Sequence, residues 1–235
     1  MRLHRNLCFA VIDGLHLIFN EGEYADKVIQ QLLKREKRWG SRDRGFVAET
    51  VYTIVRYQRL YAEIADVKAP YDRDNLWRLF AVWATLQGIK LPDWKYFTDT
   101  PSRKIKGRFD ELSKIRKYRE SIPDWMDDLG VKELGEAEWT KEMAMQNEQA
   151  DVILRVNTLK TNKQDLQLKL QSEDIETEFL PEHPSALKLK ERANVFVTEA
   201  FKDGWFEVQD ASSQLVADYL DVKPGMKVVD VCAGA

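Results

Sequence analysis

The spacing of apolar residues changes near Asp151, and this change limits the chain to folds that join a helical part to a mixed part. Before it, apolar residues recur every three to four positions, as in the stretches 3–18 and 25–33, which is the period of an amphipathic helix. After it, the run 152–157 is rich in β-branched residues, which favours a strand. The sequence therefore predicts an α+β multidomain protein.

The first part predicts one helix after another. The expected helices cover residues 3–18, 25–33, 47–65, 77–84, 104–119 and 131–147. Pro123 is expected to open a short turn between the last two. Because no β-rich run interrupts this half, a compact helical bundle is the simplest arrangement.

The second part has the order β-α-β-β. Strands are expected at 152–157, 175–180 and 186–190, with a helix of about ten residues after a capping-box pattern at Thr161–Gln164. This order is typical of a small α+β module. A further amphipathic helix follows Trp205, and a Pro-Gly turn then opens an apolar β-run at 227–231.

Composition narrows the function classes without choosing one. The chain has 235 residues, a net charge of −3 and two cysteines; its pI is about 5.8, which argues against a strongly basic nucleic-acid binder. Neither a membrane-spanning window nor a metal-ligand spacing is visible, so we expect no membrane and no metal partner. Cys8 and Cys232 lack a CxxC partner and are expected to be reduced, and the protein is expected to be cytoplasmic.

Local charge is a better guide to partners than net charge. Residues 34–44 carry six basic and two acidic side chains, and residues 103–119 carry eight basic and two acidic ones. Such segments are either solvated helix faces or phosphate-binding surfaces. Trp39, Tyr57 and Tyr61 lie among arginines, where they either stack on bases or pack into the core.

Three segments together resemble one family. They are Leu-Arg-Val-Asn-Thr-Leu-Lys-Thr at 154–161, Phe-Glu-Val-Gln-Asp-Ala-Ser-Ser-Gln at 206–214 and Val-Asp-Val-Cys-Ala-Gly-Ala at 229–235. Their order and spacing are similar to those of the Sun/Nop-type RNA cytosine-5 methyltransferases, in the branch with an N-terminal NusB-like domain. Asp-Arg-Gly-Phe-Val-Ala-Glu at 43–49 is similar to that NusB-like domain.

The resemblance implies three domains. Residues 1–147 would form a NusB-like helical bundle that docks RNA, and residues 148–204 a small α+β module of the ferredoxin or RRM type. Residues 205–235 would then begin a Rossmann-like catalytic domain, of which the chain holds the first helix and strand.

The resemblance also implies a reaction. Such enzymes take the methyl group of S-adenosylmethionine to C5 of a cytosine in RNA, commonly ribosomal RNA. One cysteine attacks C6 to activate C5, and a second helps to release the product. Both cysteines are expected beyond residue 235, so the chain carries no catalytic residue and should be inactive. The cofactor-binding residues would be Cys232, Ala233, Gly234 and Ala235, where small side chains let the backbone approach the ligand.

The candidate RNA-binding residues are Lys104, Lys106, Arg108, Lys117 and Arg155. Arg155, with Asn157, either holds the α+β module against the catalytic domain or touches RNA. In the 209–214 segment, Asp210 or Ser212 either caps the following helix or faces the cofactor or base pocket.

Two rival functions remain open at this stage. One is a non-catalytic NusB-like RNA-binding or assembly factor. The other, weaker, is a methyltransferase that acts on protein or a small molecule. The sequence fixes neither the RNA nor the oligomeric state.

Overall fold

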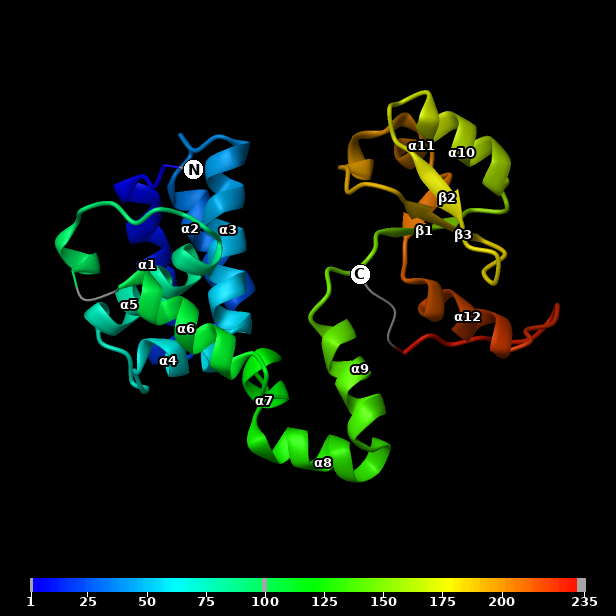
Figure 1. The fold of residues 1–235 in the computed structure, drawn as a ribbon. Coiled ribbons are helices and arrows are strands. Elements are labelled where there is room, and N and C mark those ends of the chain that lie inside the picture. Colours follow the sequence, from blue (N-terminus) through cyan, green and yellow to red (C-terminus); the bar gives the residue numbers. More distant parts are fainter. Residues whose placement is uncertain (1, 99–100, 232–235) are drawn as a thin grey trace. The chain divides into compact units, whose positions relative to one another are not determined.

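A computed structural model describes residues 2–98 and 101–231 of the chain. It divides into two compact units, Met1–Glu148 and Gln149–Ala235 (Figure 1). The first unit is helical, and the second contains a four-stranded antiparallel sheet. The predicted α+β multidomain class is therefore confirmed.

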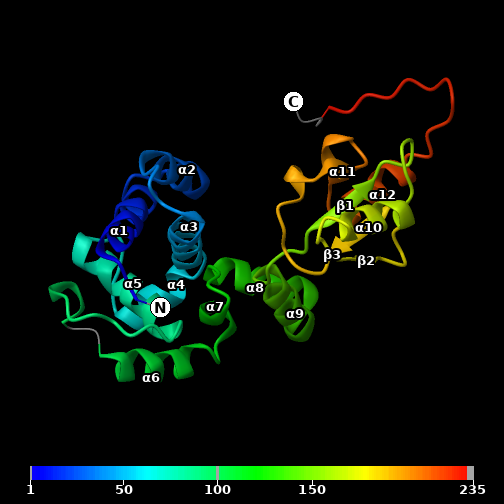
Figure 2. The ribbon, with the colours of Figure 1, turned by 90° about the horizontal axis from the view of Figure 1, so that it is seen from above.

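The first unit contains nine α-helices among its described residues, with a short 3-10 helix at Lys95–Phe97. The α-helices are α1 (Arg5–Asn20), α2 (Ala25–Arg35), α3 (Ser41–Arg56), α4 (Gln58–Ala65), α5 (Arg73–Leu86), α6 (Ser102–Leu112), α7 (Arg116–Arg119), α8 (Asp124–Leu134) and α9 (Glu136–Gln146). Helices α1 to α5 gather into a bundle, and α6 runs along its outer edge (Figure 2). Trp77, Phe80 and Leu15 are fully buried in this core, and each contributes about 1.5–3 kcal/mol by burial.

Three of the predicted helices were drawn too long, and each is in fact two helices. The stretch 47–65 is divided at Tyr57, whose ψ of 25° departs from helical geometry. The stretch 104–119 is divided at residues 113–115 between α6 and α7. The stretch 131–147 is divided at Gly135, whose φ of +80° lies in the region that favours glycine. Apolar spacing alone continues across such breaks, so periodicity does not reveal them.

The second unit is built on four strands and three helices. They are β1 (Ile153–Val156), α10 (Lys163–Gln171), β2 (Thr177–Phe179), β3 (Ala186–Leu189), α11 (Glu199–Lys202), β4 (Phe206–Val208) and α12 (Ala211–Tyr219), with a 3-10 helix at Val195–Val197. The spatial order is β2-β3-β1-β4, with every neighbouring pair antiparallel. Up to β4, this is the β-α-β-β-α-β arrangement of ferredoxin-like folds.

The two faces of this sheet are covered by different helices. Leu154 and Leu187 pair across β1 and β3 and pack with Leu166 and Leu170 of α10. Ile153, on the opposite face of β1, packs with Ala211 of α12. Strand β4 pairs with β1, so the predicted division after residue 204 falls inside this sheet.

Two local expectations are corrected by the structure. Helix α10 is capped by Asn162, whose side chain accepts a hydrogen bond from the Asp165 amide at 2.9 Å, and not by the predicted box that starts at Thr161. The run 227–231 forms no strand, and Val229 and Val231 are 81% and 89% exposed. A strand needs a hydrogen-bonded neighbour, and no described segment pairs with this run.

Candidate RNA-binding site

Four of the eight cations in segment 103–119 form ion pairs. Three of them pair with carboxylates of other helices, and Arg119 pairs with the residue next to it in sequence. These pairs are Arg108 with Glu63, Arg116 with Asp127 and Glu136, Lys117 with Asp124, and Arg119 with Glu120. Arg108 also donates to the Glu63 carbonyl oxygen at 2.6 Å. These four side chains are therefore engaged with carboxylates, and an RNA contact of Arg108 or Lys117 stays a prediction.

The other four cations are free. Arg103, Lys104, Lys106 and Lys114 have no ion-pair partner within residues 2–98 and 101–231. All four are exposed, and the first three lie on α6. Asp110 and Glu111 on the same helix are exposed as well, so the free charge of this surface is positive but modest. Of the five predicted RNA contacts, Lys104 and Lys106 are the two on α6 without an ion-pair partner among the described residues.

The contrast between unpaired and ion-paired cations gives a testable prediction about which of them bind RNA phosphates. Replacing Lys104 and Lys106 together with glutamine should weaken binding of single-stranded RNA and reduce the slope of log K against log salt by about 1.4, since each lost phosphate contact is worth about 0.7. Fluorescence anisotropy with a labelled oligonucleotide at several salt concentrations measures the slope.

The matched control is the double replacement of Arg108 and Lys117 with glutamine. This variant should lower the unfolding midpoint while the salt slope changes little, because both side chains are already engaged with carboxylates. If the control variant instead carries the loss of slope, the free cations of α6 do not bind phosphate.

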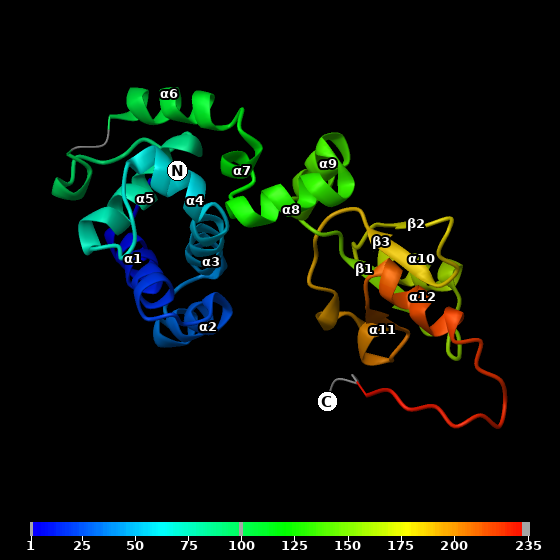
Figure 3. The same cartoon turned by 90° about the horizontal axis from the view of Figure 1, so that it is seen from below.

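The second basic segment, 34–44, joins the end of α2 to the start of α3. Arg44 is half-buried and donates to the Leu33 carbonyl oxygen at 2.9 Å, and Arg38 lies 3.8 Å from Glu36. Lys34, Arg35, Lys37 and Arg42 are exposed, with no ion-pair partner in the described chain. The views in Figures 2 and 3 place α2 and α6 on opposite sides of the helical unit, so the two segments form separate surfaces.

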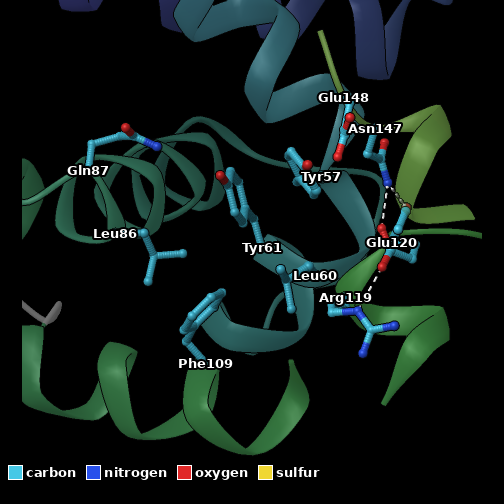
Figure 4. A pocket seen from close by; sticks show the side chains of 11 residues that line it. Tyr57, Leu60, Tyr61, Leu86, Gln87, Phe109, Arg119, Glu120, Asn147 and Glu148 are labelled. Atoms are coloured by element: carbon cyan, nitrogen blue, oxygen red, sulfur yellow. Dashed lines mark hydrogen bonds and ion pairs between the residues drawn. The ribbon is translucent and has the colours of Figure 1, made fainter. Parts of the chain in front are cut away.

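The three aromatic residues near the basic segments lie in the core, in a pocket or in both. Trp39 and Tyr61 are 9% and 4% exposed and belong to the hydrophobic core, which confirms core packing for these two rings. Tyr57 is half-buried, and with Tyr61 it lines a pocket of about 550 Å³ (Figure 4). The pocket is built from five stretches between residues 57 and 148, and sequence reasoning had no signal that brings these stretches together.

In the second unit, Arg155 is exposed on the inner strand β1, between Ala186 of β3 and Glu207 of β4. Its Nη1 donates to Gln209 Oε1 at 3.3 Å, and it lines a pocket of about 470 Å³ with Ser185 and Glu207. Asn157 has a structural role, because its Nδ2 donates to the Gly204 carbonyl oxygen at 2.9 Å and its Oδ1 accepts from the Leu159 amide at 3.2 Å. An RNA contact of Arg155 stays a prediction.

The 209–214 segment forms the start of α12. Asp210 is the N-cap and accepts hydrogen bonds from the Ser212 amide, at 3.0 Å, and from the Ser212 hydroxyl. The hydroxyl first, and then the amides of the first turn, hold the pKa of Asp210 below its ordinary value. Gln214 is 6% exposed and donates to the Gln209 carbonyl oxygen at 3.0 Å. The capping interpretation of Asp210 is therefore confirmed.

Of the two cysteines, Cys8 lies among the described residues and Cys232 does not. Cys8 is fully buried in the helical core, and this burial raises the pKa of its thiol to about 12, so it is not a nucleophile at neutral pH. The predicted cofactor-binding residues Cys232, Ala233, Gly234 and Ala235 lie outside the described residues. The structure therefore assigns no part of a methyl-donor site to them.

Two other kinds of feature are absent from the described residues. None of their helices is both long enough and apolar enough to cross a membrane. Likewise, no three His, Cys, Asp or Glu side chains in those ranges gather as metal ligands would.

Comparison with known proteins bears on what these surfaces serve. Residues 122–196 match the family model described as methyltransferase RsmF/B-like, ferredoxin-like domain. A probable ribosomal RNA small subunit methyltransferase B from Synechocystis is 25% identical over 97% of the chain. The ribosomal RNA small subunit methyltransferase B of Proteus mirabilis is 23% identical over 98% of it. The predicted resemblance to this methyltransferase family is confirmed.

The match to these relatives is partial in length. The chain spans 58% of the Synechocystis protein and 50% of the Proteus protein, which is about half the length of the curated relatives it matches. The crystal structure of PH0851 has a similar fold, with a TM-score of 0.62 and 21% identity, over 96% of this chain and 57% of that one. The RsmF/B-like model begins at residue 122, so it takes in α8 and α9 as well as most of the small sheet.

Proposed function

We propose that the chain is the N-terminal part of an S-adenosylmethionine-dependent methyltransferase that modifies C5 of a cytosine in ribosomal RNA. The observation that carries the proposal is the match to two ribosomal RNA small subunit methyltransferase B proteins over nearly the whole chain. The motifs at 154–161 and 206–214 lie on β1 and on β4 with the start of α12, and these elements form one sheet and its cover.

In this proposal the described residues bind RNA, and the residues that catalyse methyl transfer lie outside them. Residues 1–147 would act as the NusB-like RNA-docking domain, and the sheet of β1 to β4 with its helices as the ferredoxin-like module. The segment that follows α12 would lead into the Rossmann-like domain at the methyl-donor turn. The free cations of α6 and of segment 34–44 support the docking role, since phosphate contacts come from exposed, unpaired lysine and arginine.

Cys8 takes no part in the proposed reaction. Its thiol is buried and its pKa is about 12, whereas attack on cytosine C6 needs an accessible thiolate. The nucleophilic and releasing cysteines are therefore assigned to the part of the enzyme that follows residue 235. S-adenosylmethionine, when bound, supplies the methyl group, and residues 2–98 and 101–231 are assigned no step in its transfer.

Bisulfite sequencing of small-subunit ribosomal RNA tests the proposal. RNA from cells with the intact gene should retain one cytosine that converts to uracil in cells without it, because 5-methylcytosine resists deamination by bisulfite. Purified residues 1–235 should transfer no tritiated methyl group to the unmodified RNA. An unchanged conversion pattern in the two cell types would reject cytosine C5 as the target, and transfer by the purified chain would reject the assignment of the cysteines.

A further inference from the structure

One pocket of the helical unit has no role in the family resemblance. Its volume is about 550 Å³, within the range of pockets that hold small ligands. The lining residues are Tyr57, Leu60, Tyr61, Leu86, Gln87, Phe109, Arg119, Glu120, Ala144, Asn147 and Glu148. Figure 4 shows the two tyrosines in the middle, with Leu86 and Phe109 on one side and the Glu120–Asn147 pair on the other.

The apolar wall of this pocket is aromatic. The rings of Tyr57 and Tyr61 have centroids 6.0 Å apart and planes inclined by 30°. Tyr61 is buried while Tyr57 is half-buried, so Tyr57 presents the accessible ring face. Flat ligands stack on such faces, and every nucleobase has one.

The polar wall contains an ion pair between Arg119 and Glu120 and the exposed carboxylate of Glu148, so its charged side chains sum to −1. Glu120 is 8% exposed, and its carboxylate accepts from Arg119 Nε at 2.7 Å and from Asn147 Nδ2 at 2.9 Å. Nη2 of Arg119 has no hydrogen-bond partner within the described ranges. Burial, helped by the neighbouring Tyr57, raises the pKa of Tyr61, so its hydroxyl stays protonated. The wall thus offers a donor at Arg119 and an amide at Asn147 to the edge of a base.

Free positive charge lies on the same helix as one wall of the pocket. Phe109 of α6 lines the pocket, and Lys106 precedes it by three residues, or about 4.5 Å along the helix axis. Lys104 precedes Lys106 by two residues, which is about half a helical turn further from Phe109. Proteins that bind single strands combine a cationic track for phosphates with an aromatic platform for bases.

We propose that this pocket takes one unpaired nucleobase of an RNA strand whose phosphates lie along Lys104 and Lys106. The base stacks on Tyr57, and its edge meets Arg119 and Asn147. This site rests on the proposed RNA-docking function of the helical unit and adds a base-binding position to it.

Replacement of Tyr57 with leucine tests the site, using anisotropy with two labelled twelve-nucleotide probes. One probe is oligouridine, and the other has the same backbone with abasic riboses. Tyr57→Leu should weaken oligouridine binding about tenfold, the loss of one base stack, without altering the salt slope. The abasic strand should bind the wild-type chain and Tyr57→Leu equally well.

Three variants complete the design. Tyr57→Phe keeps the ring and should bind as the wild type does. Tyr52→Leu removes a tyrosine that is 44% exposed on α3 and lies outside the pocket, and it should also have no effect. Ala144→Trp fills the pocket from an exposed position on α9 without deleting any contact, and should weaken oligouridine binding even if Tyr57→Leu fails to fold.

The outcomes separate this site from the function on which it rests. If Lys104 and Lys106 matter but Tyr57→Leu and Ala144→Trp bind normally, RNA docking stands and the base pocket is rejected. Equal weakening of both probes by Tyr57→Leu also rejects it. If the wild-type chain binds neither probe, the docking function and the pocket fail together.

Discussion

Replacing Gly130 with alanine should unfold the α8–α9 hairpin far more easily, at a cost of about 3 kcal/mol. Gly130 is buried in α8, and a Cβ atom there would lie 2.2 Å from two atoms of the Trp139 ring. Such overlap exceeds what a flexible neighbour absorbs and falls among the severe overpacking changes. The Trp139 ring is itself fixed, because its Nε1 donates to Asp127 Oδ1 at 2.9 Å. Urea unfolding and amide hydrogen exchange across residues 124–146 measure the loss.

Gly107 supplies the matched control for this prediction. It also lies within a helix, α6, but an added Cβ would meet no atom within 4 Å. Gly107→Ala should therefore stabilise the chain, by up to about 1 kcal/mol, through helix propensity. In a Trp139→Ala background the ring is gone, and Gly130→Ala should then behave as Gly107→Ala does. If Gly130→Ala is neutral in the wild-type background, the close packing of α8 on Trp139 is wrong.

The local sequence pattern predicted which helices and strands form better than it predicted where they begin and end. Helices α1, α2 and α5 and strands β1 and β3 were anticipated because periodicity and β-branching are properties of neighbouring residues. The break at Gly135 had a local signal in its glycine. The break at Tyr57 had none, because nothing in the residue itself disfavours a helix there, and the turn is set by packing between distant segments.

Contacts between distant segments explain the remaining differences. Strand β4 joins the sheet by pairing Phe206 with Val156, fifty residues earlier in the chain, and no local feature encodes that partner. The same holds for charge. Lys106 and Arg108 are both cations of one basic segment, yet Arg108 pairs with Glu63 of α4 while Lys106 has no ion-pair partner in the described part of the chain. Charge counts along a chain therefore mark candidate RNA contacts, but the fold decides which of them are available.

Replacing Arg116 with methionine should destabilise the helical unit by about 2–3 kcal/mol at pH 7. Arg116 is 10% exposed and Asp127 is 13% exposed, and Nε of Arg116 donates to Asp127 Oδ1 at 2.7 Å. Arg116 also pairs with Glu136 and donates to Thr140 Oγ1 at 2.9 Å, so it joins α7 to α8 and α9. Methionine keeps the aliphatic volume but leaves the Asp127 carboxylate partly buried with one remaining partner, and an unpaired buried charge is costly. Urea unfolding followed by tryptophan fluorescence measures this loss of stability, because every tryptophan except Trp205 lies in the helical unit.

The pH dependence identifies the cause of that loss. The hydrogen bond from Arg116 holds the pKa of Asp127 below its ordinary value. In the wild type this contribution is therefore complete above about pH 4 and disappears as the pH falls through the lowered pKa. In Arg116→Met the carboxyl loses this support and protonates more readily in the folded state. The difference in unfolding free energy between the two proteins should therefore shrink as the pH falls from 6 towards 4.

Two further variants separate the buried pair from its exposed neighbour. Glu136→Gln removes a carboxylate whose side chain is 73% exposed, so it should cost less than about 1 kcal/mol. Asp127→Asn keeps an oxygen for the Trp139 hydrogen bond and removes the charge. Adding it to Arg116→Met should recover part of the lost stability, since the partly buried carboxylate that lacked its cation is then gone. Equal losses in Arg116→Met and Glu136→Gln would show that the Arg116–Asp127 pair contributes no more than a surface ion pair, and that α7 is held to α8 and α9 by apolar packing alone.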